Sequence, residues 1–124
     1  MNENKVWKVR AVRPYADAHT HLFVGQVQAC DQISIRLLCR TYHHGRVVNR
    51  LRDIVEGPLM TRIIPWHQVE VINELPDRFD FRHATVAIDH EGNYDLFDGF
   101  LSCVLLSARD RLIAATHPVP QRYV

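Results

Sequence analysis

Histidine and cysteine have the clearest capacity for chemistry in this 124-residue chain, because both residue types ligate transition metals. The candidate ligands are His19, His21, Cys30, Cys39, His43 and His44. His19 and His21 stand two residues apart, so in a strand they would point the same way and could share one metal. No spacing in the chain matches a zinc signature such as C-x-x-C or H-x-x-x-H, and we therefore expect neither a metal nor another cofactor.

The segment Asp17-Ala18-His19-Thr20-His21-Leu22 resembles the metal-binding start of amidohydrolases, in which two such histidines ligate one metal. This resemblance would imply a small metal-dependent hydrolase that uses His19 and His21. The amidohydrolase motif needs a full (β/α) barrel, and a barrel of that type takes at least about 200 residues. The chain is too short for that scaffold, so we interpret the segment as a loop and strand start that carries two surface histidines.

We expect no nucleophilic enzyme and name no catalytic residue. Ser102 or Cys103 would need a histidine and an orienting acid nearby, but both lie in the apolar run F-L-S-C-V-L-L. A buried thiol has a raised pKa and is inert. The sequence Asp89-His90-Glu91-Gly92-Asn93 has the composition of half a calcium loop, yet it lacks the terminal glutamate of that loop, and a hairpin turn explains it.

Composition narrows the class of protein. A chain of 124 residues with 47% hydrophobic residues forms one ordinary globular domain. The net charge of +1 provides no overall field that would attract nucleic acid. Three cysteines without a C-x-x-C pair predict a reduced, cytoplasmic protein. No secretory signal is visible, and no apolar run approaches the ~18 residues of a membrane span, so we expect no membrane partner.

The elements that must position these residues are mostly strands. Alternating or apolar runs predict five of them, over residues 6–13, 21–30, 33–41, 60–64 and 68–73. Gly25 interrupts the second strand, and an interior glycine marks a bend or a close backbone approach. Asp31-Gln32 makes the reversal that follows. Pro65 separates the last two strands, because proline cannot donate to a central ladder.

Two segments carry helical signals. A stripe of helical period runs through Val47, Val48, Leu51, Ile54 and Val55, and Gly57-Pro58 follows it. This pattern predicts a helical insert over 46–56. Beyond residue 76, residues 84–89 and 94–97 predict a hairpin. Residues 100–116 fit either a helix with Asp98 as N-cap or two buried strands with a turn at 108–110, and we favour the helix.

The order of strand, strand, Asp turn, strand, insert, short strand, kink and strand over residues 6–75 resembles the Sm-like family. Gly25 and Asp31 look like the glycine of its second strand and the aspartate of its following turn. The resemblance implies a mainly β fold, namely a five-stranded, bent antiparallel Sm-like or SH3-like barrel over 1–76. The helical insert would interrupt that barrel, and a C-terminal α+β appendage over 77–124 would pack on it or on a neighbouring subunit.

Sm-like proteins commonly pair the fourth strand of one subunit with the fifth strand of the next, which produces rings of six or seven. The resemblance therefore implies a homo-oligomer whose edge strands carry Arg62, Ile63, Ile64, Val69 and Val71. Family members often bind RNA at the Asp turn and between the last two strands. With outward arginines added, the RNA-binding residues expected here are Asp31, Gln32, Ser34, Arg36, Arg40, Trp66 and His67.

This chain differs from the family at the positions where family members contact RNA. The Asp turn continues as Gln32-Ile33-Ser34 instead of the usual Met-Asn step, and Pro65-Trp66 stands where Arg-Gly is common. The leading hypothesis is a non-enzymatic, ring-forming protein that binds single-stranded RNA. The second is a protein-interaction or scaffold module without nucleic-acid binding, in which residues 77–124 dock a partner. The hydrolase that uses His19 and His21 is the third.

Overall fold

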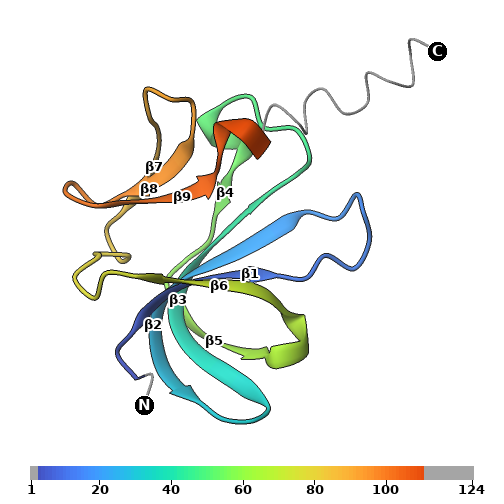
Figure 1. The fold of residues 1–124 in the computed structure, drawn as a ribbon, viewed down its shortest axis with the longest axis vertical. Coiled ribbons are helices and arrows are strands. Elements are labelled where there is room, and N and C mark those ends of the chain that lie inside the picture. The colour runs from blue at the N-terminus through green and yellow to red at the C-terminus, as the bar shows by residue number, and fades with distance from the viewer. Residues whose placement is uncertain (1–2, 111–124) are drawn as a thin grey trace.

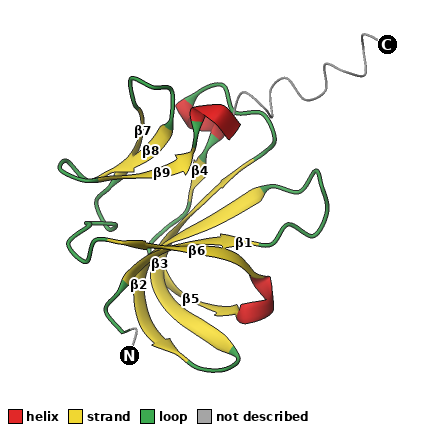
Figure 2. Ribbon diagram, in the orientation of Figure 1, coloured by secondary structure: helices red, strands yellow, loops and turns green. Residues whose placement is uncertain are grey.

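The computed structural model describes residues 3–110, and within that range the protein is mainly β, with nine strands and two 3-10 turns (Figures 1 and 2). The strands are β1 (Val6–Ala11), β2 (Thr20–Cys30), β3 (Ser34–His44), β4 (Val55–Glu56), β5 (Met60–Pro65), β6 (Val69–Leu75), β7 (Thr85–Ile88), β8 (Tyr94–Phe97) and β9 (Ser102–Leu106). The 3-10 turns are η1 (Leu51–Asp53) and η2 (Trp66–Gln68). No helix in the described range is long and apolar enough to cross a membrane. The five strands predicted before residue 76 are confirmed, with ends that differ by three residues or fewer.

The larger sheet has six antiparallel strands in the order β4-β3-β2-β1-β6, and β5 also pairs with β3. β3 is long enough for two strands to pair with it along the same edge. Its residues 34–39 pair with β5, whereas Tyr42 and His43 pair with β4. Among the described residues, neither β5 nor β6 has a second neighbouring strand, so both are sheet edges. β7, β8 and β9 form a separate antiparallel sheet, drawn above the larger one in Figure 1.

The larger sheet is buried on both faces. One cluster, here called the inner core, is built only by strands of this sheet and comprises Trp7, Val9, Val27, Ile35, Leu37, Cys39 and Ile64. The other, the inter-sheet core, joins the two sheets and comprises Val6, Leu22, Val24, Tyr42, Val48, Ile54, Phe79, Phe81, Ala84, Tyr94, Leu96, Cys103 and Leu105. Burial on two faces explains why β2 is apolar at both Val24 and Val27, which would otherwise break a period of two.

The backbone of β3 lies very close to Gly25 in β2, as an interior glycine predicts. Gly25 lies opposite Cys39 in β3 and Trp7 in β1. A Cβ atom at Gly25 would stand 2.0 Å from the Leu38 carbonyl oxygen and 2.5 Å from the Cys39 Cα. A register shift between Val27 and Ala29 then adds a bulge to the same strand. Glycine and bulge together let the hairpin bend sharply enough to enclose the inner core.

The predicted helix over 46–56 is wrong. This segment is an irregular loop that contains η1 and ends in β4, which pairs with β3. Only Val48 and Ile54 of the apolar stripe are buried, in the inter-sheet core. The Asp53 carboxylate accepts hydrogen bonds from the Asn49 and Arg50 amides at 2.8 and 3.2 Å, and these bonds stabilise a turn. Backbone pairing of β4 with β3 thus outweighs the helix propensity of this segment.

The C-terminal hairpin is confirmed as β7 and β8, whereas the favoured helix over 100–116 is wrong for residues 102–106. Those residues form β9, which pairs with β8. Cys103 and Leu105 are buried while Ser102 and Val104 are exposed, so the period is two and not 3.6. Residues 108–110 are helical, and residues 111–116 lie outside the described range.

We expect Gly25→Ala to lower the free energy of unfolding by about 3 kcal/mol or more, because the new methyl group would overlap backbone atoms of β3. Urea unfolding measures the loss. Gly45→Ala is the matched control, since a Cβ there would meet His19 Nε2 at 3.5 Å, an ordinary contact. Equal losses in the two variants would show that the approach at Gly25 is not the constraint.

Candidate functional site

The Asp31 turn between β2 and β3 is held by its own side chain. Asp31 Oδ1 accepts hydrogen bonds from the amides of Ile33 at 2.8 Å and Ser34 at 2.9 Å. The Asp31 amide in turn donates to the Ser34 carbonyl oxygen at 3.0 Å. Hydrogen bonds from the two backbone amides, that of Ser34 first, hold the pKa of Asp31 below its usual value. The carboxylate is therefore ionised and shapes the loop.

Trp66 fastens the η2 turn to the Asp31 turn. Its Nε1 donates to the Asp31 carbonyl oxygen at 2.7 Å, and its amide donates to the Ile33 carbonyl oxygen at 3.0 Å. The ring is half-buried and packs against the inner core. The Trp66 side chain therefore packs against the inner core, and little of its ring is free to stack on a base. Gln32 and His67, its neighbours in the two turns, are exposed.

The predicted arginines separate in the structure. Arg36 is exposed in β3 opposite Ile63, and both border a small cavity of about 150 Å³ together with Asp31 and Ser34. Arg40 lies farther along β3, where its Nη1 donates to the Arg82 carbonyl oxygen at 3.3 Å and its Nη2 stands 3.8 Å from Glu56 Oε1. Six of the seven predicted RNA-binding residues therefore lie around the joined Asp31 and η2 turns, and Arg40 lies elsewhere. Those six are Asp31, Gln32, Ser34, Arg36, Trp66 and His67.

The predicted edge residues lie on β5 and β6. Ile63 is 59% exposed, whereas Ile64 beside it is buried in the inner core. Arg62 is half-buried, and its Nε has no hydrogen-bond partner within the described part of the chain. Val69 and Val71 are half-buried on β6.

Four histidines lie at the end of the β2–β3 hairpin that is remote from the Asp31 turn. The Nδ1 atoms of His19 and His43 stand 3.2 Å apart, and the His21 ring stacks on His43 with centroids 5.2 Å apart. His44 is buried, and its Nδ1 donates to the Gly45 carbonyl oxygen at 2.8 Å. Residues 3–110 contain no group of three or more His, Cys, Asp or Glu side chains placed to hold a metal ion.

Burial lowers the pKa of two of these histidines. For His21, desolvation is the main cause, followed by repulsion from His43 and His19. For His44, desolvation again dominates, and its bond to Gly45 partly offsets it. Both rings are therefore held in the neutral form near neutral pH.

Two buried cysteine thiols are not activated as nucleophiles. The structure also contains a buried carboxyl group that the sequence did not predict. Burial raises the pKa of Cys39 and of Cys103 to about 11, so both stay protonated near neutral pH. Burial, followed by the neighbouring Asp89, raises the pKa of Asp95 to about 6. Asp95 is buried in β8 between Tyr94 and Leu96, a position that the hairpin pattern alone does not mark.

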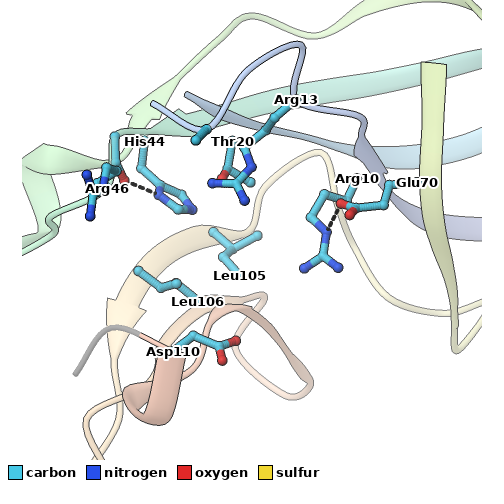
Figure 3. Close-up of a pocket in the computed structure, with 11 residues that line it drawn as sticks. Arg10, Arg13, Thr20, His44, Arg46, Glu70, Leu105, Leu106 and Asp110 are labelled. Atoms are coloured by element: carbon cyan, nitrogen blue, oxygen red, sulfur yellow. Dashed lines mark hydrogen bonds and ion pairs between the residues drawn. The ribbon is translucent and has the colours of Figure 1, made fainter. Parts of the chain in front are cut away.

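Sequence reasoning also missed a cavity between the two sheets. It has a volume of about 660 Å³ and lies between the larger sheet and β9 (Figure 3). Arg10, Arg13, His44, Arg46, Leu105 and Leu106 line it. These residues come from segments far apart in the sequence, so no local motif announces the site. In the sequence, two of its arginines flank the histidine segment, Arg13 before His19 and Arg46 after His44.

Comparisons of this chain with protein-family models, with curated proteins and with solved structures found no match.

We expect the free energy of unfolding to fall as the pH drops through about 6.5. His21 and His44 have lowered pKa values when folded, so in this range the unfolded chain binds more protons than the native state. Asp95 acts in the opposite sense, because its pKa is raised to about 6 and folding then favours its protonated form. Urea unfolding at several pH values between 8 and 5 measures the net slope.

The Asp95→Asn variant separates the two contributions. Without the opposing carboxyl group, stability should fall more steeply with acid than in the unaltered protein. Adding His44→Gln to that variant should flatten the profile again. A profile that is unchanged by either substitution would show that these groups do not govern the pH dependence.

Proposed function

We propose that this protein is a non-enzymatic small-barrel protein of the Sm-like type that assembles with copies of itself through its strand edges. The observation that carries the proposal is the strand order, in which β5 and β6 are edges and are joined by η2. These are the strands that the Sm-like resemblance identifies as fourth and fifth, the two that pair between subunits in that family. The bend at Gly25 supports the barrel-like curvature of the same sheet.

The chemistry of the two edges supports a head-to-tail contact. β5 exposes Ile63 at 59% and Met60 at 43%, an apolar surface on a strand whose outer edge is unpaired among the described residues and needs cover. β5 also carries Arg62, whereas β6 carries the exposed Glu74. Opposite charges on the two edges favour pairing of β5 with the β6 of another copy rather than with a second β5. A head-to-tail contact of this kind closes into a ring when its rotation allows.

Within this assembly we infer a surface for single-stranded RNA around the Asp31 turn. Arg36 offers an exposed guanidinium, and Gln32 and His67 offer exposed polar side chains at the same end of the molecule. Trp66 holds the two turns together through its bond to Asp31. Repetition of this surface around a ring would multiply a modest charge, since each chain carries a net charge of only +1.

A protein-interaction module is the second candidate, and one observation favours it. Phe100, in the turn between β8 and β9, is 92% exposed, and Phe97 next to this turn is 42% exposed. Ile88, at the other end of the β7–β8 hairpin, is 49% exposed. Exposed aromatic side chains on one sheet fit a protein partner better than a nucleic acid. This candidate predicts capture of a protein by the smaller sheet and no binding of oligonucleotides.

Chromatography with light scattering at micromolar concentration tests the assembly. We expect a mass that is a multiple of the 14.4 kDa chain. Ile63→Lys should shift the mass towards the monomer, because it places a charge in the centre of the proposed contact. Ile88→Lys is the control, since Ile88 is similarly exposed, at 49%, but lies on β7 of the other sheet. A monomeric parent protein would end the assembly proposal.

Fluorescence anisotropy with labelled oligo-U tests the RNA surface. We expect binding at about 50 mM salt that weakens at about 200 mM, since phosphate contacts release counterions. Arg36→Gln should weaken binding and reduce the salt slope by about one. Arg13→Gln removes a guanidinium at the other end of the molecule and should leave the affinity unchanged. Absence of binding at the lower salt would refute the RNA surface without affecting the assembly.

A further inference from the structure

We propose that the cavity between the two sheets binds a small organic molecule that carries one phosphate group. The cavity lies away from the Asp31 turn, because its walls are formed by the strand ends near Thr20 and His44 and by β9, with Glu70 of the edge strand β6 at one end (Figure 3). Its volume of about 660 Å³ falls in the range typical of small-molecule sites.

Arginine dominates the polar wall of the cavity. Arg10 Nε stands 2.8 Å from Glu70 Oε1, and Arg46 Nη1 stands 3.1 Å from Asp17 Oδ1. Each of these contacts uses one of the five guanidinium donors, so the carboxylates orient the arginines while other donors stay available. Figure 3 shows Arg10 and Glu70 at one end of the cavity and Arg46 at the other.

Among the described residues, Arg13 is the arginine of this cavity that has no carboxylate partner. It lines the cavity near His44, and no carboxylate within residues 3–110 pairs with it. It is also close enough to His44 to disfavour a positive charge on that ring. A guanidinium with no anion beside a sheltered cavity is a preferred partner for phosphate, which it can bind through two parallel hydrogen bonds.

His44 adds a sheltered hydrogen-bonding atom to the same wall. Because the Gly45 carbonyl oxygen can only accept, the 2.8 Å contact requires the proton on Nδ1 of His44 and leaves Nε2 as an acceptor. The residue is only 6% exposed and lines the cavity. Nε2 can therefore accept a hydrogen bond from a phosphate monoanion. With a dianion, the ring would gain a proton and donate from Nε2 instead.

The remaining walls select the class of phosphate ligand. Leu105 and Leu106 from β9 face the arginines across the cavity, so part of the ligand surface must be apolar (Figure 3). Glu70 and Asp110 also line the site, and together with Asp17, the partner of Arg46, they balance the three arginines when His44 is neutral. That balance suits a single phosphate group, and it disfavours a triphosphate or a nucleic-acid strand.

Isothermal titration calorimetry on the full chain tests the inference with four probes: adenosine 5′-monophosphate, adenosine, adenosine triphosphate and inorganic phosphate. We expect the monophosphate to bind more tightly than the other three. If inorganic phosphate binds as tightly as the monophosphate, the apolar wall contributes nothing and the organic part of the inference is wrong. If no probe binds at millimolar concentration, the cavity is not a phosphate site.

Two arginine variants locate the binding. Arg13→Gln should weaken monophosphate binding at least about 10-fold, the usual scale for one charge-assisted hydrogen bond. Arg36→Gln, at the far end of β3, should leave it unchanged. Equal weakening by both would overturn the assignment to the cavity. Thermal unfolding checks that each variant folds, and neither arginine has an ion pair to lose within the described residues.

A proton resonance gives a readout that general destabilisation would not mimic. If phosphate contacts His44, the pKa of its ring must rise when the monophosphate is bound, because the anion favours the charged imidazole. Titration of the His44 ring protons by NMR, with and without the probe, measures the change. The ring protons of His90, which lies in the β7–β8 turn, should not change their resonance when the probe is added at fixed pH. An unshifted His44 would place the phosphate elsewhere.

Discussion

The close approach of β2 to β3 at Gly25 is the constraint on which the rest of the structure depends. The backbone of β3 occupies the space where any side chain at Gly25 would begin, with the Leu38 carbonyl oxygen 2.0 Å from that position. With the bulge between Val27 and Ala29, this contact lets one hairpin enclose the inner core. The same bend leaves the outer face of the hairpin free to pack against the smaller sheet.

The hairpin of β2 and β3 also separates the two proposed activities. One end carries the Asp31 turn, which Trp66 ties to η2 and hence to the edge strands β5 and β6. The other end pairs Thr20 with His44 and borders the cavity below β9. Each end therefore has its own polar groups, and both depend on the register that the hairpin maintains.

Strand pairing explains the two incorrect helix predictions. The stripe around Leu51 has helical spacing, but residues 55–56 gain a ladder with β3 and only Val48 and Ile54 find places in the inter-sheet core. Residues 102–106 are apolar at nearly every position, so the sequence alone does not distinguish a helix from a strand. They form a strand because they pair with the edge of β8 that β7 leaves free. In both segments backbone pairing with a neighbouring strand outweighs a local helical preference.

The sequence by itself determined the features whose causes are local. Alternating or apolar runs placed β1, β2, β3, β5 and β6, and the missing Cβ of Gly25 marked the bend. The Asp31 carboxylate reaches amides only two and three residues ahead. The turn residues of the candidate RNA surface were foreseen for the same reason. Only the tertiary structure decided that Arg40 turns to Glu56, that Asp95 is buried, and that Arg13 and His44 share a cavity with β9. Those contacts join segments tens of residues apart, and they depend on how a bent sheet and a second sheet pack together, which no short window of sequence encodes.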